Sequence, residues 1–130
     1  MSTSNRVKIV DLGTEELIFE VDAPLAWLTF NRPEARNAMT WAMYDGLVRA
    51  CEWVDKNDDI KAFLLKGAGD KAFIAGTDIS QFTQFESPQD AIDYEARMNN
   101  IIGRLEAVKK PTIALIRGYA VGGGAAIAMA

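Results

Sequence analysis

Three consecutive glycines, Gly122-Gly123-Gly124, follow an apolar stretch and precede the small apolar residues 125–130 (AAIAMA). Glycine lets the backbone turn sharply and bring bare N–H groups close to a ligand. Residues 125–130 are good helix formers, so the glycines are predicted to lie at a helix N-terminus, which carries unpaired N–H donors and a partial positive charge. The pattern predicts a site for an anion, or for an oxygen that becomes anionic during a reaction.

A second glycine turn, Ala75-Gly76-Thr77-Asp78, also follows an apolar segment. Both turns are predicted to follow strands of one sheet, and ligands of open α/β sheets bind beyond the carboxyl ends of the strands. Two backbone N–H groups that converge there would form an oxyanion hole. Backbone donors need only the right geometry, so this interpretation does not require a threonine at position 77.

Other interpretations of the glycine triplet are possible. A phosphate-binding loop needs a lysine after its last glycine, where this chain has Ala125, and the dinucleotide pattern G-x-G-x-x-G fails at Ile127. A membrane span is disfavoured by Arg117 and by the helix cost of three glycines. Close packing of the backbone in an α/β core, with no chemistry, stays open.

Composition excludes several classes of function. The 130 residues carry 14 Lys and Arg against 18 Asp and Glu, a net charge of −4 that gives no electrostatic support to nucleic-acid binding. The single cysteine, Cys51, forbids an internal disulfide and is predicted to be a core residue. With no targeting segment at the start and no membrane segment, we expect a cytoplasmic protein. The absence of histidine excludes His-assisted nucleophiles and His-containing metal sites within these residues, and we predict no metal.

The first half of the chain is predicted to form strands and then a helix. Alternating or apolar patterns predict strands at 6–11, 16–21 and 25–30, joined as a meander. A polar loop follows at 31–37, and Asn37 or Thr40 can cap the next helix. The inward face of this helix is predicted from three-to-four spacing as Met39, Met43, Leu47, Ala50, Cys51 and Val54.

The second half is predicted to alternate strands and helices. Strands at 60–66 and 72–75 follow the first helix, and this order favours parallel pairing and an α/β architecture. Ser87 and Pro88 are typical of a helix start, here for residues 89–107. Its apolar face is predicted as Ala91, Tyr94, Met98, Ile101, Ile102 and Leu105. Residues 112–116 have the composition of a buried strand, which Arg117-Gly118-Tyr119 is expected to end. Residues 1–130 contain no linker or repeat.

Three motifs in this order make the chain resemble the crotonase superfamily, the enoyl-CoA hydratase/isomerase family. They are NRPEARNAM at 31–39, KAFIAGTDI at 71–79 and KKPTIALIRGYAVGGGAAIAMA at 109–130. The resemblance implies an α/β spiral of repeated β-β-α units, truncated at the C-terminal end, with residues 1–130 as the N-terminal part of an acyl-CoA-binding domain. It also implies a trimer or a hexamer, and a role in fatty acid metabolism.

The resemblance further implies an acyl-CoA enzyme. The thioester carbonyl would lie between the backbone N–H groups of Thr77 and Gly123. Coenzyme A would be part of the substrate, with no separate cofactor. The residues that the resemblance assigns to coenzyme A are Ala35, Arg36, Ala38, Ala75, Gly76, Asp78 and Ile79. Asp78 is also expected to hold the turn in shape by bonding to nearby backbone N–H groups.

One departure from the family pattern bears on the reaction. Hydratases of the family carry a glutamate where this chain has Ala126, and syn addition of water is served by two carboxylates. A one-carboxylate reaction such as double-bond isomerisation is the simpler expectation. Dehalogenation, thioester hydrolysis, decarboxylation and a non-catalytic acyl-CoA-binding fragment stay open, whereas RNA binding is disfavoured by the acidic balance.

The general acid or base is not assigned by the sequence. The carboxylates near the motifs are Asp78, Glu86, Asp90 and Glu95, and we interpret the last three as solvated charges. Tyr94 and Tyr119 are interpreted as packing residues. Family members continue beyond this point, so the proton-transfer group is expected after residue 130.

Overall fold

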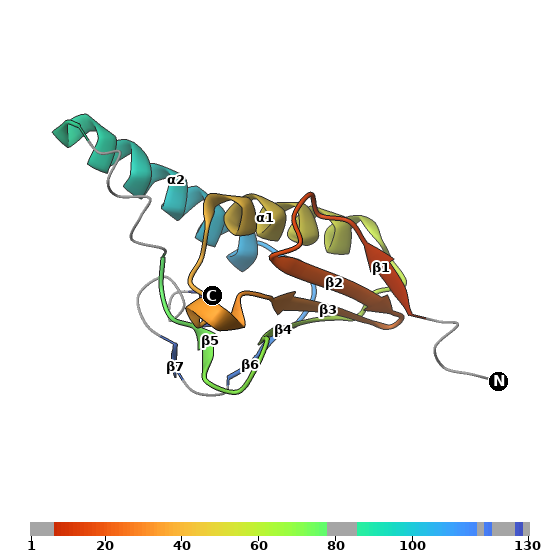
Figure 1. The fold of residues 1–130 in the computed structure, drawn as a ribbon. Coiled ribbons are helices and arrows are strands. Elements are labelled where there is room, and N and C mark those ends of the chain that lie inside the picture. The colour runs from red at the N-terminus through yellow and green to blue at the C-terminus, as the bar shows by residue number, and fades with distance from the viewer. Residues whose placement is uncertain (1–6, 78–85, 117–118, 121–126, 129–130) are drawn as a thin grey trace.

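The computed structural model describes residues 7–77, 86–116, 119–120 and 127–128. These residues form a five-stranded sheet whose one face is covered by two helices, together with a second sheet of two short strands (Figure 1). The predicted α/β class is confirmed.

The large sheet has the strand order β1-β2-β3-β4-β6. Strands β1 (Lys8–Val10), β2 (Leu17–Asp22) and β3 (Leu25–Phe30) form the predicted antiparallel meander, although β1 is shorter than expected. Strands β4 (Ala62–Gly67) and β6 (Thr112–Leu115) extend the sheet in parallel, as the strand-helix-strand order predicts. The carboxyl ends of β3, β4 and β6 therefore share one edge of the sheet.

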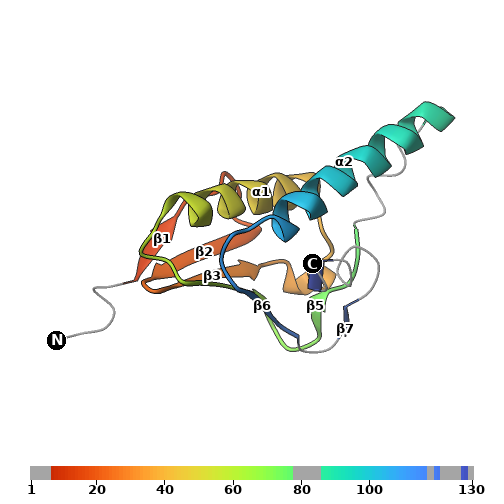
Figure 2. The same cartoon turned by 180° about the vertical axis from the view of Figure 1, so that it is seen from behind.

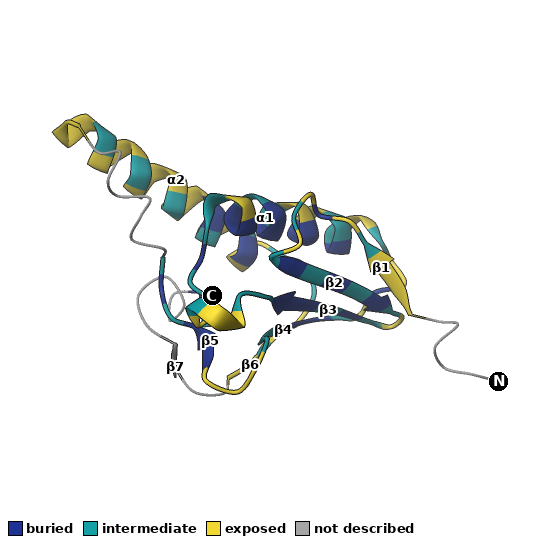
Figure 3. Ribbon diagram, in the orientation of Figure 1, coloured by how far each residue is buried: buried dark blue, intermediate teal, exposed yellow. Residues whose placement is uncertain are grey.

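Helix α1 (Trp41–Lys56) buries more side chains than α2 against the covered face of the sheet (Figure 3). It is capped by Thr40, whose hydroxyl accepts the N–H of Met43. All six side chains of the predicted apolar face are fully buried, which confirms the prediction for the five on the helix, whereas Met39 lies before the capping residue Thr40. Among them is Cys51, a free thiol whose pKa burial raises to about 12, so that it is uncharged at neutral pH.

Helix α2 (Pro88–Glu106) begins as predicted, with Ser87 as its cap and Pro88 in its first turn. Its buried residues, Ile101 and Leu105, are in the C-terminal half, whereas Ala91 and Ile92 of the N-terminal half are exposed and Tyr94 packs against Trp41. The N-terminal half extends past α1, as the view from behind shows (Figure 2). The predicted apolar face is therefore correct for its second half and wrong for Ala91.

In the described part of the chain, no helix has the length and apolar character needed to cross a membrane.

Asp55 ties the end of α1 to the end of α2. Its carboxylate accepts hydrogen bonds from Arg104 Nη2 at 2.7 Å and from the N–H of Lys109 at 2.9 Å. Burial raises the pKa of Asp55, but the hydrogen bonds and the positive charges of Arg104 and Lys109 outweigh it and hold the pKa below its usual value. Asp55 therefore stabilises the fold in its ionised form.

We expect Asp55→Asn to lower the free energy of unfolding by about 1 kcal/mol at neutral pH, because a neutral amide accepts these charged hydrogen bonds less strongly at this partly exposed position. Since the folded pKa is depressed, the contribution is present above the unfolded pKa of about 3.9 and is lost as pH falls through the folded pKa. The difference between wild type and variant, measured by urea unfolding, should therefore shrink below about pH 4. A difference that stays constant into the acid range would contradict this assignment. Asp45→Asn, which breaks an exposed pair with Arg97, is the control and should cost less than about 0.5 kcal/mol.

Strand β6 corrects one expectation. Residues 112–116 were predicted to be a buried strand, but β6 is the last strand in the sheet order, and Ile113, Leu115 and Ile116 are 47%, 42% and 51% exposed. Thr112 and Ala114 face the helices and are half-buried, while the side chains of Ile113 and Leu115 lie on the opposite face. An apolar composition alone does not separate a central strand from an edge strand.

The small sheet corrects a second expectation. It consists of β5 (Ala72–Ile74) and β7 (Tyr119–Ala120), paired in parallel, and residue 119 belongs to a strand where a turn was predicted. The two glycine turns were expected to follow strands of one sheet, taken as 72–75 and 112–116. Strand 112–116 lies in the large sheet instead, and the strand that precedes the glycine triplet beside β5 is β7. The predicted parallel pairing of the strands before the two glycine turns is therefore present, but the partner of β5 is β7 and not strand 112–116.

Candidate functional site

The loop between β3 and α1 has a tightly defined shape. It contains the short 3₁₀ helix η2 (Pro33–Ala35), followed by Arg36 and Asn37 in left-handed conformations with φ of 53° and 58°. Asparagine adopts this region more readily than most residues. The side chain of Asn37 is fully buried, accepts the N–H of Arg32 at 2.8 Å, and donates to the carbonyls of Ala68 and Ala72 at 3.0 and 2.9 Å. Asn37 thus fastens this loop to the connection between β4 and β5.

Backbone hydrogen bonds join the same loop to the first glycine turn. The N–H of Ala75 donates to the carbonyl of Arg36 at 3.1 Å, and the N–H of Met39 donates to the carbonyl of Gly76 at 2.7 Å. Met39 and Thr77 form a parallel bridge. The turn itself depends on Gly76, whose φ of 107° is strained for any residue with a side chain. Two of the three sequence motifs therefore form one structural unit.

The N–H of Thr77 points away from this unit. The carbonyl of Gly76 and the N–H of Thr77 belong to one trans peptide, in which the two groups point in opposite directions. Because the carbonyl faces Met39, the N–H of Thr77 faces the other side. This is the orientation that a donor to a ligand requires.

The side chain of Thr77 is held by two tyrosines. Tyr44 of α1 has its hydroxyl 2.7 Å from Thr77 Oγ1, and Tyr94 of α2 donates to the same oxygen at 3.2 Å. Tyr44 is fully buried, and burial raises its pKa to about 12 although the hydrogen bond to Thr77 lowers it, so the hydroxyl is neutral at neutral pH. Trp41 packs against both rings, with centroids 5.5 Å from Tyr44 and 5.4 Å from Tyr94.

A cavity of about 230 Å³ lies beside the loop and the start of β5. Its polar lining combines the cations Arg36 and Lys71 with the carboxylate of Asp70. A neighbouring cavity of about 270 Å³ lies beyond the carboxyl end of β4 and is lined by Gly67, Gly69 and Leu115 among others. Both cavities thus adjoin the short segment between β4 and β5 that Asn37 holds.

The structure brings together the predicted residues that it describes. These are Ala35, Arg36 and Ala38 in the loop, and Ala75, Gly76 and Thr77 in the turn. The other predicted site residues, Asp78, Ile79 and Gly123, lie outside the described residues, as does Ala126, where hydratases of the family carry a glutamate. In the described part of the chain, no group of three or more His, Cys, Asp or Glu residues is placed to hold a metal ion.

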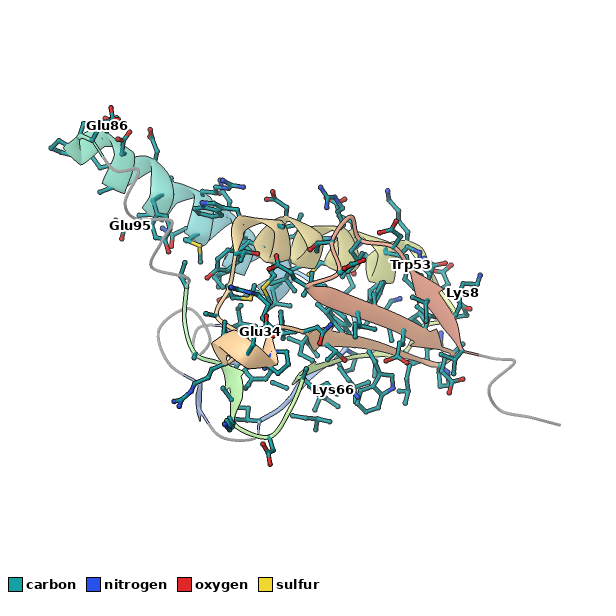
Figure 4. The ribbon with its side chains drawn as sticks, in the orientation of Figure 1. Lys8, Glu34, Trp53, Lys66, Glu86 and Glu95 are labelled. Carbon is teal, nitrogen blue, oxygen red and sulfur yellow. The ribbon has the colours of Figure 1, made fainter. Side chains whose placement is uncertain are left out.

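The remaining candidate carboxylates lie on α2 or just before it. Glu86 and Glu95 are exposed, and Figure 4 shows Glu95 on the part of α2 that extends past α1 and Glu86 at the start of that helix, just before its first residue. Asp90 accepts the N–H of Glu86 at 2.7 Å at the helix start. The interpretation of Glu86 and Glu95 as solvated charges agrees with their exposure.

Sequence reasoning missed three contributors to the site. Asn37 was considered only as a helix cap, Tyr44 was not singled out, and Tyr94 was interpreted as a packing residue, although its hydroxyl bonds to Thr77. The one available signal was the buried position of Tyr44 next to Met43 on α1, because a buried tyrosine hydroxyl needs a hydrogen-bond partner. Which residue supplies that partner depends on contacts across the fold.

Comparison with known proteins gives a family match over most of the chain. A family model described as enoyl-CoA hydratase/isomerase matches residues 25–130. A crotonyl-CoA hydratase of Syntrophomonas wolfei is 36% identical over 118 residues, which cover 91% of this chain and 45% of that protein. A short-chain-enoyl-CoA hydratase of Clostridium acetobutylicum is 34% identical over 113 residues, which cover 87% of this chain and 43% of that protein. The chain therefore spans less than half the length of these relatives.

The fold matches as well as the sequence. The crystal structure of an enoyl-CoA hydratase/carnithine racemase from Magnetospirillum magneticum superposes with a TM-score of 0.83 at 30% identity, and covers 95% of this chain and 45% of that one. The predicted crotonase-like fold is thereby confirmed. The chain belongs to the enoyl-CoA hydratase/isomerase family of the crotonase superfamily.

Proposed function

We propose that this chain forms part of an enzyme that acts on an acyl-CoA thioester through an enolate. The thioester oxygen, which gains negative charge as the enolate forms, would accept hydrogen bonds from the backbone N–H groups of Thr77 and Gly123. Donors fixed before the reaction at the position where charge develops are among the strongest contributors to catalysis. Coenzyme A enters with the substrate, and the proposal includes no separate cofactor.

The observation that carries this proposal is the register between β5 and β7. Ile74 pairs with Ala120 in parallel, after an irregularity of the register between Ala72 and Ile74. Thr77 is three residues beyond Ile74, and Gly123 is three residues beyond Ala120. Because β5 and β7 run parallel, the chain leaves both strands at the same end of the small sheet, and three residues of chain reach at most about 11 Å. The register therefore supports both donors serving one oxygen atom.

The loop and the turn suit the coenzyme A part of the substrate. The proposed contacts are Ala35, Arg36, Ala38, Ala75, Gly76, Asp78 and Ile79. The cations Arg36 and Lys71 line the same 230 Å³ cavity, and paired cations suit phosphate oxygens. Because hydrogen bonds hold the loop and the turn together, both sides of this binding surface would keep their spacing.

Ala126 favours isomerisation over hydration. Hydration adds a hydroxyl group to one carbon of the double bond and a proton to the other, so it needs one group to activate water and another to deliver the proton. Isomerisation moves one proton between two carbons, and a single carboxylate can take it up and return it. We propose that the carboxylate lies outside residues 1–130, and that hydration of crotonyl-CoA is the weaker activity.

Ala126→Glu tests this assignment. We expect the added carboxylate to raise hydration of crotonyl-CoA by about 10²-fold, the lower range for a positioned acid or base. The measurement is the absorbance of the conjugated thioester over time, with isomerisation of a 3-enoyl-CoA followed in parallel. Ala126→Gln is the control, since it has the same shape without the carboxylate. An equal gain in both variants, or no gain in Ala126→Glu, would contradict the proposal.

Assembly and location are proposed with the function. We infer a trimer or a hexamer from the family resemblance, to be checked by the mass of the native protein in solution. A cytoplasmic location is supported by the single, reduced Cys51 and by the bacterial relatives.

A further inference from the structure

Two tyrosine hydroxyls from two different helices meet at the side chain of Thr77. Tyr44 Oη lies 2.7 Å and Tyr94 Oη 3.2 Å from Thr77 Oγ1. We propose that Tyr44 and Tyr94 are positioning residues that hold Thr77, and through it the peptide whose N–H would contact the thioester oxygen. This inference rests on the proposed function. A backbone N–H donor by itself would tolerate any side chain at position 77, whereas the inference requires a residue with a hydroxyl group there.

The peptide between Gly76 and Thr77 needs such a restraint. Its carbonyl is held by the N–H of Met39 at 2.7 Å. On one side of this peptide, Gly76 lacks a side chain and has a φ of 107°, so its Cα restricts rotation of the peptide plane less than another residue would. On the other side, the Thr77 side chain is attached to the Cα that carries the donor N–H. Fixing the hydroxyl therefore restrains the direction of the N–H, together with the hydrogen bond from Met39 to the carbonyl.

The two tyrosines are themselves held firmly. Tyr44 is fully buried in the core beneath α1, and its ring is tilted against Trp41. The ring of Tyr94 meets Trp41 edge to face, and the guanidinium of Arg97 lies 3.8 Å from the Trp41 centroid on the same helix as Tyr94. The hydroxyls thus come from rings whose positions are set by packing, so little conformational entropy is lost when they hold Thr77.

The test compares variants that differ by single hydroxyl groups. Thr77→Val has nearly the shape of threonine without the hydroxyl, Thr77→Ser keeps the hydroxyl, and Tyr44→Phe removes one partner. Thr112→Val is the control, because it removes a threonine hydroxyl that bonds to the carbonyl of Lys110 on the edge strand β6. Thermal unfolding of each variant verifies that it is folded.

Two measurements separate positioning from stability. The first is kcat and KM for crotonyl-CoA and a 3-enoyl-CoA. The second is the infrared stretching frequency of the ¹³C-labelled thioester carbonyl in the bound state, which falls when the oxygen accepts well-aligned hydrogen bonds. We expect Thr77→Val and Tyr44→Phe each to lower kcat about five- to tenfold, the worth of one hydrogen bond, with KM changed less than about twofold. Both should also lose part of the carbonyl shift, while Thr77→Ser and Thr112→Val should retain it.

The double variant gives a further criterion. If both hydroxyls act through one contact, Thr77→Val combined with Tyr44→Phe should be no slower than the slower single variant. If Thr77→Val and Tyr44→Phe show the same carbonyl shift as the wild-type protein, the positioning role is overturned. The proposed function is unaffected by that result. A wild-type protein that binds no acyl-CoA, or binds it without a carbonyl shift, would overturn the proposed function and this inference together.

Discussion

Gly123→Val is expected to lower turnover of an acyl-CoA thioester by about 10²–10³-fold, because it removes one of the two proposed donors to the oxyanion. Valine adds a branched side chain at a position where the backbone must approach the thioester oxygen. It also restricts the backbone, since a β-branched residue tolerates few of the conformations open to glycine. The loss should appear in kcat, measured with a 3-enoyl-CoA, while binding of free coenzyme A should be retained because its proposed contacts are in the loop and the first turn.

The same substitution elsewhere is the control. Gly103 is exposed on α2, and no heavy atom lies within 4 Å of the Cβ that a side chain would add there. Gly103→Val should leave both turnover and coenzyme A binding unchanged. Normal turnover by Gly123→Val, with the fold verified by circular dichroism, would rule out Gly123 as a donor.

Local signals in the sequence were sufficient to predict the main elements. Thr40 and Ser87 cap the two helices because their hydroxyls accept N–H groups in the first turn, an interaction set within a few residues. The buried face of α1 follows from three-to-four spacing, and the meander follows from alternation. Each of these features depends on neighbours in the chain, which is why a pattern could reveal it.

The features that the sequence did not reveal depend on distant contacts. Strand β7 has only two residues, too few for a periodic pattern, and it exists because Tyr119 and Ala120 pair with β5. Ile113 and Leu115 are exposed because they lie on the face of the sheet opposite the helices, on its last strand, and composition does not encode this placement. Likewise, the contact between Tyr44 and Thr77 joins residues 33 positions apart.

The site itself was partly predictable for the same reason. The glycine turn at 75–77 carries its own conformational requirement, since Gly76 has a φ that favours glycine. The support for that turn comes from elsewhere: the Arg36 carbonyl accepts from Ala75, and Asn37 binds the carbonyls of Ala68 and Ala72. The motif at 31–39 therefore has a structural task beside its proposed contact with coenzyme A, because it fixes the start of the turn.

Gly67 lies at the centre of this support, and Gly67→Ala should be strongly destabilising. A Cβ at this position would lie 2.5 Å from the carbonyl oxygen of Phe73, 2.6 Å from that of Ala72 and 2.7 Å from Asn37 Nδ2. Two of these three atoms belong to the backbone, so the clash cannot be relieved by turning a flexible side chain. We expect the free energy of unfolding, measured with urea, to fall by about 3 kcal/mol, the upper range for overpacking.

The steric clash of a Cβ at position 67 also predicts an effect on ligand binding. Any shift that relieves it moves Asn37 or β5, and both hold the loop and the turn on which the proposed oxyanion donor depends. Gly67→Ala should therefore also weaken coenzyme A binding under conditions in which the variant is still folded. Gly103→Ala is the matched control and should raise stability by about 0.5–1 kcal/mol, because alanine is the better helix former and has open space there. If Gly67→Ala and the wild-type protein are equally stable, the connection between β4 and β5 can deform at little cost. It would then not be a rigid support for the site.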